Sequence, residues 1–165
     1  MNEVVRSAWS NATCNGDFVC VETWSGYRSS MRDPQGKQYL LSPDISVQEL
    51  GAALLDALAH SRFVLPAEDL NLYDYKQGIE RNATWIADLM TRYGYKTKRA
   101  LFKDMKSCNV RSQGGVITIR PSKHEKLESW SGDGISEGDY VVLPANSSAE
   151  EVGKALQLAF SRCIG

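Results

Sequence analysis

Residues Tyr39 to Phe63 read YLLSPDISVQELGAALLDALAHSRF, and residues Tyr140 to Cys163 read YVVLPANSSAEEVGKALQLAFSRC. The two stretches align from their first tyrosines when one residue is inserted in the second copy, which also brings Gly51 onto Gly153. Self-similarity at a fixed spacing indicates repeated supersecondary units. We therefore predict two related half-units that are joined by a middle segment.

Each copy predicts a helix with an N-terminal cap. Ser46 and Ser148 are each followed three residues later by a glutamate, the pattern of a capping box, in which hydroxyl and carboxylate each satisfy a free backbone amide. The predicted apolar faces are Leu50, Leu54, Ala57, Leu58 and Ser61 in the first helix, and Val152, Leu156, Ala159, Phe160 and Cys163 in the second. Glycine inside a helix costs about 1 kcal/mol relative to alanine. Its recurrence as Gly51 and Gly153 predicts that both helices closely approach a sheet.

Short apolar runs predict three strands before each helix. They cover residues 4–9, 18–24 and 39–41 in the first half, and 107–111, 116–120 and 140–143 in the second. Asn15-Gly16 and Gln113-Gly114-Gly115 predict the tight turns. The expected fold is α+β: two βββα half-units form one mixed or antiparallel sheet with helices packed on it. A single domain spans 1–165, with half-units 1–63 and 104–165 and a helical connector at 64–103.

The connector contains one long amphipathic helix. Its apolar stripe is Ile79, Ala83, Ile86, Met90 and Tyr93, widened by Trp85 and Leu89. Gly94 follows the last turn and predicts the end of the helix. Leu101 and Phe102 are expected to be buried, in a segment for which both a short helix and a strand remain open. The longer stretch from Pro121 to Asp139 is expected to be a loop.

Composition narrows the class of protein. The formal net charge is −1, which argues against a dedicated nucleic-acid coat, because such proteins are strongly basic. The first residues, MNEVVRSAWSNATC, contain no apolar signal-peptide core, and no apolar run approaches the roughly 20 residues that span a bilayer. We expect a cytoplasmic protein with no membrane contact.

The sequence contains four cysteines: Cys14, Cys20, Cys108 and Cys163. We expect them to be reduced in the cytoplasm. A two-residue turn at Asn15-Gly16 would place Cys14 opposite Asp17 and about 10 Å from Cys20, too far for a disulfide. His60 and His124 do not complete a zinc pattern. Neither a metal nor a cofactor is therefore expected.

No complete catalytic constellation is present. His124 beside Glu125 resembles half of an acid–base pair, but neighbouring residues on an extended chain point apart. Trp130-Ser131-Gly132-Asp133-Gly134 matches neither glycine-rich phosphate loop. We expect Trp130 to anchor its loop by burial. Trp24-Ser25-Gly26 resembles Trp130-Ser131-Gly132 and extends the predicted repeat upstream.

Two charged segments are candidate binding surfaces. The basic one contains Lys96, Lys98, Arg99, Lys103 and Lys106, interleaved with Tyr93, Tyr95 and Phe102. Aromatic residues among cations can stack on single-stranded nucleic acid, but a solvated face or a contact with an acidic segment of the same chain is favoured. The acidic one contains Glu125, Glu128, Asp133, Glu137 and Asp139 beside Trp130. A loop of this composition suits a basic protein partner.

Three stretches resemble the immunity proteins of bacterial contact-dependent growth inhibition (CDI) systems. They are YLLSPDISVQELGAALLDALAHSR (39–62), YGYKTKRALFKDMKSC (93–108) and GVITIRPSKHEKLESWSGDGISEGDYVVLPANSSAEEVGKAL (115–156). The resemblance implies a protein that is not an enzyme and that binds the C-terminal toxin domain of a delivered CdiA-type effector. It also implies that the toxin is a nuclease, commonly an RNase. It assigns no contact residue and no oligomeric state.

We predict that the toxin contacts Glu125, Glu128, Trp130, Asp133, Glu137 and Asp139. Two alternatives stay open. A small hydrolase would use His124 and Glu125 and would lose turnover in His124→Ala. A nucleic-acid-binding module would use Lys96 to Lys106 and would show an affinity that falls steeply with salt.

Overall fold

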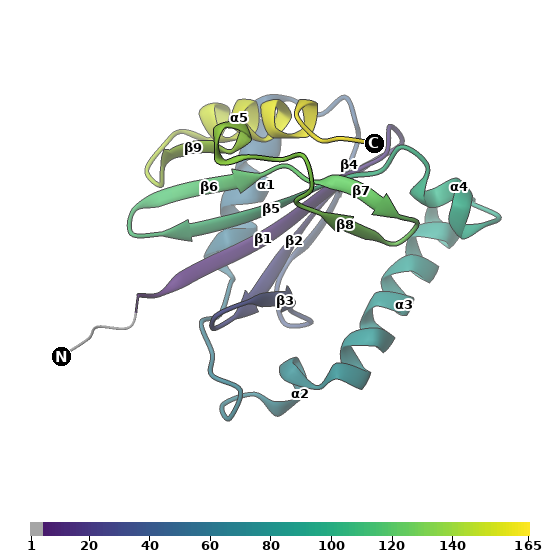
Figure 1. Ribbon diagram of the computed structural model, residues 1–165, viewed down its shortest axis with the longest axis horizontal. Helices are drawn as coiled ribbons and strands as arrows, with labels where there is room; N and C mark the ends of the chain where they lie inside the picture. Colours follow the sequence, from purple (N-terminus) through teal and green to yellow (C-terminus); the bar gives the residue numbers. More distant parts are fainter. Residues whose placement is uncertain (1–4) are drawn as a thin grey trace.

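A seven-stranded antiparallel sheet forms the centre of the fold in the computed structural model, which describes residues 5–165 (Figure 1). The strands are β1 (Ser7–Cys14), β2 (Val19–Gly26), β3 (Ser30–Arg32), β4 (Gln38–Leu41), β5 (Lys106–Gln113), β6 (Val116–Arg120) and β9 (Val141–Pro144). Their order is β3-β2-β1-β5-β6-β9, and β4 also pairs with β2. The predicted α+β architecture with an antiparallel sheet is confirmed. The start of the first predicted strand, at Val4, lies outside the described residues.

The two hairpins on either side of the sheet centre share one pairing register. Ala12 pairs with Val21 in the first hairpin, as Val110 pairs with Ile119 in the second. The strands that follow also correspond, because Leu41 lies opposite Val19 and Leu143 lies opposite Ile117.

This register changes the alignment that was predicted for the two copies. By pairing register, Leu41 occupies the position in the first hairpin that Leu143 occupies in the second, which sets Tyr39 beside Val141 and not Tyr140 and requires no inserted residue. The predicted match of Trp24 with Trp130 is also wrong. Trp24 lies in β2 of the main sheet, whereas Trp130 lies in a separate hairpin.

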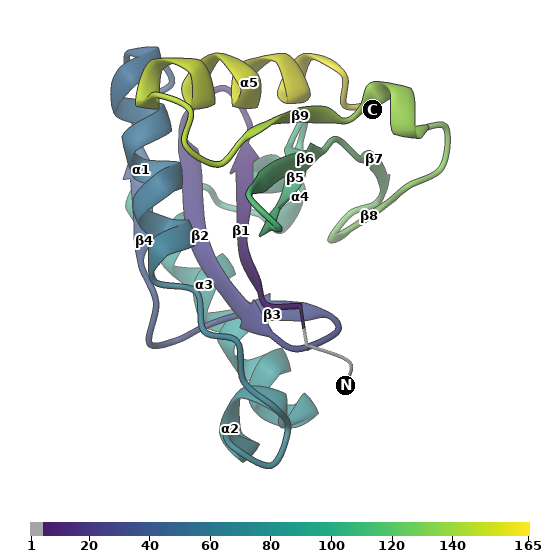
Figure 2. The same ribbon diagram turned by 90° about the vertical axis from the view of Figure 1, so that its left-hand side faces the viewer.

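Helices α1 (Val47–Ala59) and α5 (Ala149–Ser161) cover one face of the sheet (Figure 2). Both begin after the predicted cap residues, because the hydroxyls of Ser46 and Ser148 accept hydrogen bonds from backbone amides three residues later, at 3.1 and 3.2 Å. The glutamate half of the predicted capping box is not formed: the carboxylate of Glu151 accepts from the hydroxyl of Ser148, at 3.1 Å, and not from its backbone amide. Their buried residues are Leu50, Gly51, Ala53, Leu54, Ala57 and Leu58 in α1, and Val152, Gly153, Ala155, Leu156, Ala159 and Phe160 in α5. The predicted apolar faces are thus confirmed except for their last members, because Ser61 and Cys163 lie beyond the helix ends and are half-buried.

The two helix glycines face the other helix and not the sheet, so that prediction was wrong. A Cβ atom on Gly51 would lie 1.7 Å from the backbone oxygen of Ala149, and one on Gly153 would lie 1.8 Å from that of Val47. These distances are far below any van der Waals contact. The glycines therefore allow α1 and α5 to cross in direct backbone contact.

The main hydrophobic core lies between this helix pair and the sheet. Alternate residues of each strand point into it, such as Ala12 on β1, Val21 on β2 and Val110 on β5. Ile117 and Ile119 on β6 lie in the same core, as their alternation predicts. The opposite face of the same strands carries mainly polar residues.

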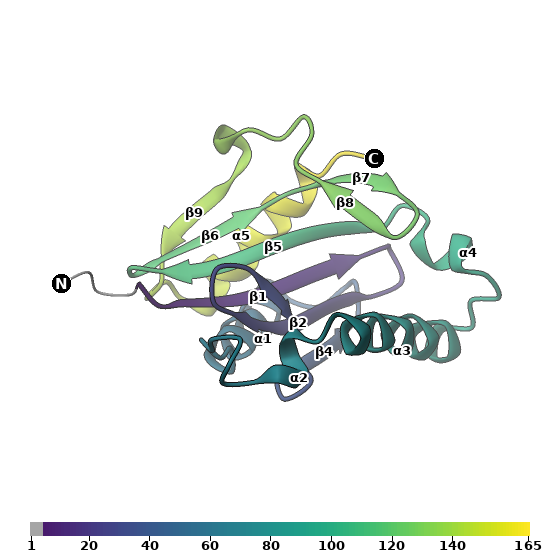
Figure 3. The same ribbon diagram turned by 60° about the horizontal axis from the view of Figure 1, so that its bottom comes forward.

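The connector packs on the opposite face of the sheet (Figure 3). It contains α2 (Leu70–Tyr73), α3 (Tyr75–Tyr93) and α4 (Lys98–Phe102). Its buried residues form a second hydrophobic cluster with the sheet: Phe18, Cys20, Trp85, Ile86, Leu89, Leu101, Phe102 and Met105. Gly94 ends α3 with a left-handed φ of 73°, as predicted. The predicted stripe is buried only in its C-terminal part, since Ile79 is 54% exposed.

Residues 121–139 are not the simple loop that was expected. They contain a hairpin of β7 (Lys123–Lys126) and β8 (Ser129–Ser131) and a 3₁₀ helix, η1 (Glu137–Asp139). Trp130 of β8 packs against the second hydrophobic cluster. The hairpin therefore folds back over the sheet face that α1 and α5 leave open.

Of the two predicted hairpin turns, the second is correct and the first is wrong. Gly114 and Gly115 have φ values of 59° and 77°, and Gln113 pairs with Val116 around them, as in the favoured two-residue hairpin turn. In the first hairpin Cys14 pairs with Val19 and not with Asp17, so residues 15–18 form a longer turn. Cys14 and Cys20 then point to opposite faces of the sheet.

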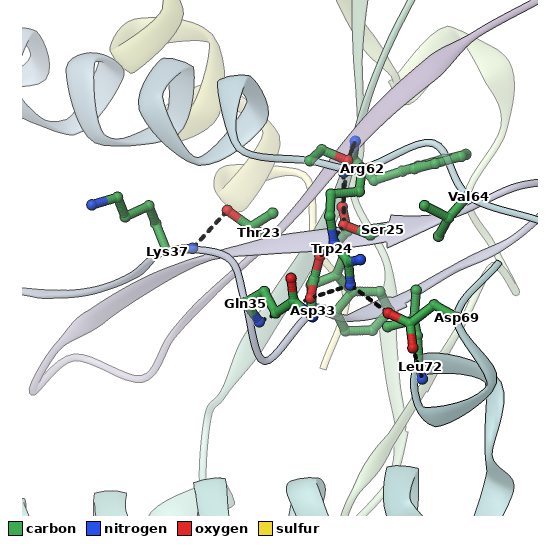
Figure 4. Close-up of polar contacts among 12 residues, drawn as sticks. Thr23, Trp24, Ser25, Asp33, Gln35, Lys37, Arg62, Val64, Asp69 and Leu72 are labelled. Carbon is green, nitrogen blue, oxygen red and sulfur yellow. Dashed lines mark hydrogen bonds and ion pairs between the residues drawn. The ribbon is translucent and has the colours of Figure 1, made fainter.

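A buried ion pair fastens the N-terminal half (Figure 4). The guanidinium of Arg62 donates to both carboxylate oxygens of Asp33, at 2.7 and 2.9 Å, and also to Asp69 at 2.9 Å. The hydroxyl of Ser25 donates to Asp33 at 2.6 Å. The cluster joins β2, the loop after β3, the end of α1 and the start of α2, in a segment that looked like a plain polar loop in the sequence.

Candidate functional site: a polar cavity on the open face of the sheet

A cavity of about 510 Å³ lies on the sheet face that α1 and α5 leave open. Its floor is formed by residues of β1, β2, β5 and β6, and its walls by residues of α3 and α4 and of the β7–β8 hairpin. Strand alternation builds the floor, because Asn11, Thr13 and Asn109 occupy the positions between the core residues. The polar floor of the cavity therefore follows from the period of two in these strands.

Buried hydrogen-bond donors without a partner are concentrated in this cavity. Within residues 5–165, the buried side-chain N and O atoms that lack a hydrogen-bond partner are Thr13 Oγ1, Trp24 Nε1, Trp85 Nε1 and Arg120 Nε, and all four residues line the cavity. Trp85 interacts with the thiol of Cys20, a weak acceptor. The other three donors have no acceptor within residues 5–165, so solvent or a bound molecule supplies one, because an unsatisfied buried donor is costly.

Two arginines are fixed at the edges of the cavity. The Arg32 guanidinium forms an ion pair with Glu22 at 2.6 Å, stacks 4.5 Å from the ring centre of Trp85 and donates to Asn82 at 3.2 Å. Arg120 lies 5.3 Å from the ring centre of Tyr140. Each stacked guanidinium is held in place before any partner arrives.

The β7–β8 wall is held by Trp130. Its indole N–H donates to the backbone oxygen of Met105 at 3.2 Å, and its ring lies 6.0 Å from that of Phe102. His124 stacks on the other side of the indole at 4.5 Å. Trp130 thus anchors its segment as predicted, but it does so with a half-buried ring and a hydrogen bond and not by full burial.

The structure places the six predicted toxin-binding residues along the hairpin and η1. Glu128 and Trp130 line the cavity, whereas the other four do not. Glu125 accepts a hydrogen bond from Ser131, and Asp139 accepts one from the backbone of Ser136 and caps η1. The four exposed carboxylates are Glu125, Glu128, Asp133 and Glu137.

The geometry does not support a hydrolase centre at His124. Its Nε2 atom lies 2.9 Å from the backbone oxygen of Leu127, and its ring is stacked on Trp130. The neighbouring Glu125 contacts Ser131 and Lys123, away from the imidazole. The two residues point apart, as their position on an extended chain predicts.

The basic segment lacks the aromatic surface that single-stranded nucleic acid needs. Tyr93 stacks on Phe18 at 4.8 Å, the hydroxyl of Tyr95 is bonded to Asp17, and Phe102 is buried. Lys98 pairs with Glu128 at 3.4 Å. The predicted contact between the basic and the acidic segments of this chain is therefore present.

Two further properties of residues 5–165 concern ions and membranes. Nowhere in that range do three or more Cys, His, Asp or Glu side chains converge as metal ligands. None of the helices there combines the length and the apolar character needed to cross a bilayer.

The sequence analysis missed most of the cavity residues. Thr13 and Trp24 lie in the neighbouring strands β1 and β2, whereas Arg120 lies in the distant strand β6, and their convergence depends on the strand order. The polar floor could have been predicted from the alternation of polar and apolar residues in the strands, because Asn11, Thr13 and Asn109 are polar residues between buried ones. This alternation predicts a polar sheet face but not a cavity.

Comparisons with known proteins point to one family. The family model described as "CdiI: CDI immunity protein" matches residues 8–163. Immunity protein CdiI-YPIII of Yersinia pseudotuberculosis serotype O:3 (strain YPIII) is 51% identical over the full length of both chains. A chain of the CdiA-CT/CdiI toxin and immunity complex from Yersinia pseudotuberculosis superposes with a TM-score of 0.94, at 51% identity, over 98% of this chain and 99% of that one. A Neisseria meningitidis protein of unknown function, NMB0488, has a TM-score of 0.89 and 35% identity over 99% and 98% of the two chains.

Proposed function

The chain belongs to the CDI immunity protein family, which makes it a toxin inhibitor and not an enzyme, and we propose that it neutralises the C-terminal toxin domain of a CdiA-type effector by binding it at the central cavity. The Yersinia relative is described in a toxin and immunity complex, which supports a partner of this kind. The immunity protein would protect the cell that produces the toxin.

The main evidence that the toxin binds at the cavity is its set of buried hydrogen-bond donors without a partner. Thr13 Oγ1, Trp24 Nε1 and Arg120 Nε are buried donors from three strands that line one cavity. A toxin segment that enters the cavity would supply backbone or carboxylate oxygens as acceptors. Each new bond would satisfy a donor that folding alone leaves without a partner.

We also propose that the acidic rim of the cavity guides the toxin to it. The rim comprises the residues predicted from the sequence: Glu125, Glu128, Trp130, Asp133, Glu137 and Asp139. The four exposed carboxylates suit a cationic partner, and a nuclease is cationic where it binds its substrate. Trp130 and Asp139 act mainly by holding the hairpin and η1 in position.

Variants of the cavity donors test the proposal directly. The C-terminal toxin domain of the cognate CdiA-type effector is co-expressed with each variant, and rescue of growth and co-purification are scored. Trp24→Phe keeps an aromatic ring but removes the N–H, and Arg120→Met removes the guanidinium. Each should weaken toxin binding about tenfold, measured by calorimetry, because a buried hydrogen bond contributes about 1–2 kcal/mol.

Trp9→Phe is the matched control. Trp9 pairs with Trp24 across β1 and β2 and is buried, but it does not line the cavity. The same chemical change there should leave the affinity within twofold. Equal affinities for wild type, Trp24→Phe and Arg120→Met, with both variants folded, would refute the cavity as the binding site.

The rim is tested through association kinetics. Reversal of Glu125, Glu128, Asp133 and Glu137 to lysine should slow association with the toxin about tenfold at low salt, and the difference should shrink as salt rises. Unaltered association rates would reject the rim while leaving the cavity proposal intact.

We further propose that residues 1–165 form one domain built from two duplicated half-units. The shared register of the two hairpins and the reciprocal glycine contacts of α1 and α5 support the duplication. The insertions differ: the first half-unit contains β3, and the second contains β7, β8 and η1. A single cooperative unfolding transition is expected, and two separate transitions would contradict a single domain.

We also propose a cytoplasmic location, which fractionation of the producing cell would test.

A further inference from the structure

Two thiols from distant parts of the chain meet under the end of α5. Cys108 belongs to the central strand β5, and Cys163 follows α5 directly. Their Sγ atoms lie 3.7 Å apart, with Cys108 fully buried and Cys163 half-buried. Both side chains pack in the main core, on the sheet face opposite to the cavity.

We propose that Cys108 and Cys163 form an oxidation site, at which a hydroperoxide converts the two thiols into a disulfide that ties β5 to the C-terminal end of α5. The site is separate from the cavity, and the proposal does not depend on toxin binding. In a reducing compartment such a bond forms transiently under oxidative stress.

The surroundings give the two sulfur atoms different roles. A hydrogen bond from Cys108 lowers the pKa of Cys163 to about 7, with burial acting in the opposite direction and the nearby Lys106 adding to the decrease. The same hydrogen bond, together with burial, raises the pKa of Cys108 well above its ordinary value. Cys163 is therefore the thiolate near neutral pH and the one that a peroxide reaches.

The reaction has two steps. The Cys163 thiolate attacks one oxygen of hydrogen peroxide, which breaks the O–O bond and leaves a sulfenic acid on Cys163 and a hydroxide ion. The sulfur of Cys108 then attacks the sulfur of the sulfenic acid. The S–O bond breaks, the proton of Cys108 leaves with the hydroxyl group as water, and a disulfide remains.

The backbone holds Cys163 in place for the second step. Its amide donates to the carbonyl of Phe160 at 3.2 Å, and the next residue, Ile164, donates to Ser122 at 3.0 Å and accepts from His124 at 2.9 Å. These bonds fix the chain on both sides of the thiol. The two sulfur atoms need to approach from 3.7 Å to the disulfide length of about 2.05 Å, which small rotations of the two side chains can provide.

The other two cysteines provide internal controls. Cys14 also packs against the main core, where burial raises its pKa to about 11, so it is a poor first nucleophile. Cys20 lies in the second hydrophobic cluster, on the opposite face of the sheet. Neither is placed to react first.

The test uses the reduced full-length protein and hydrogen peroxide at neutral pH. Free thiols are then blocked, and intact mass and peptide mapping are recorded without reductant. The expected product has lost two hydrogens, contains a Cys108–Cys163 linked peptide and is restored by dithiothreitol. The rate should rise with pH around 7, and the oxidised form should melt at a higher temperature than the reduced form.

Variants separate the two roles. Cys14→Ser and Cys20→Ser should still form the bond. Cys163→Ser, or Cys163→Ala if the serine variant does not fold, should not form it. Cys108→Ser keeps a hydrogen-bond donor beside Cys163 and should stop at a sulfenic acid that dimedone traps at Cys163. A linked peptide that joins another pair of cysteines, or unmodified Cys163 at peroxide concentrations that oxidise the unfolded chain, would overturn the proposal.

Discussion

The carboxylate of Asp33 shows how one residue links stability to pH. Its side chain is 0% exposed and accepts hydrogen bonds from Arg62 and Ser25. Burial alone would raise the pKa of Asp33, but the bonds from Arg62 and Ser25 outweigh burial and lower it from 3.8. A lowered folded-state pKa means that the carboxylate stabilises the fold fully above the unfolded-state value, and that this contribution is lost as pH falls through the folded-state value.

We predict that Asp33→Asn destabilises the protein by about 2–3 kcal/mol at pH 7, because it leaves the Arg62 charge with a weaker partner. The loss is moderate because Arg62 is 28% exposed and keeps Asp69. Urea unfolding at pH 7 measures it. The stability of the wild type should fall more steeply than that of the variant below pH 4, and parallel curves would contradict the assignment.

Asp69→Asn is the control for this change. Asp69 accepts one hydrogen bond from the same guanidinium and caps α2 through the amide of Leu72, a role that asparagine can also fill, and its replacement leaves the bonds between Arg62 and Asp33 intact. We expect a clearly smaller loss of stability than for Asp33→Asn. If Asp69→Asn and Asp33→Asn lowered the free energy of unfolding equally, Asp33 would not be the main partner of Arg62.

At the scale of elements, the sequence predicts what local periodicity determines. The helix caps at Ser46 and Ser148, the αL residue Gly94 and the strand at 116–120 are local patterns, and the structure confirms them. The β7–β8 hairpin was missed, because Lys123 to Lys126 shows no apolar alternation and is held by tertiary packing of Trp130. The glycine contacts were assigned to the wrong neighbour, because periodicity does not reveal which element a helix face meets.

We predict that Gly51→Ala destabilises the protein by about 3 kcal/mol, because the new methyl group would overlap the backbone of Ala149 and force α1 and α5 apart. Gly78→Ala in α3 is the matched control, since nothing lies within 4 Å of its Cβ position. Alanine there should stabilise the protein by about 0.5 kcal/mol through helix propensity. Thermal unfolding of both variants measures the contrast, and equal effects would contradict the close helix crossing.

At the scale of the whole molecule, the two faces of the sheet have different roles. The face under α1 and α5 forms the main core, and the other face combines a smaller hydrophobic cluster with the polar cavity. The cavity exists because the connector and the β7–β8 hairpin stand on either side of an uncovered strip of sheet. Trp130 joins these two walls through Phe102 and Met105.

We therefore predict that Trp130→Ala loosens the hairpin. We expect it to reduce the free energy of toxin binding by more than it reduces the free energy of unfolding. Hydrogen exchange of residues 123–131 should accelerate at least about tenfold, because local opening then costs less. The free energy of unfolding should fall by about 2 kcal/mol, since the side chain is only half-buried. Leu127→Ala, at a 44% exposed position in the turn of the same hairpin, should change neither quantity. Toxin affinity that survives Trp130→Ala, despite the faster exchange, would show that the toxin does not need this wall of the cavity.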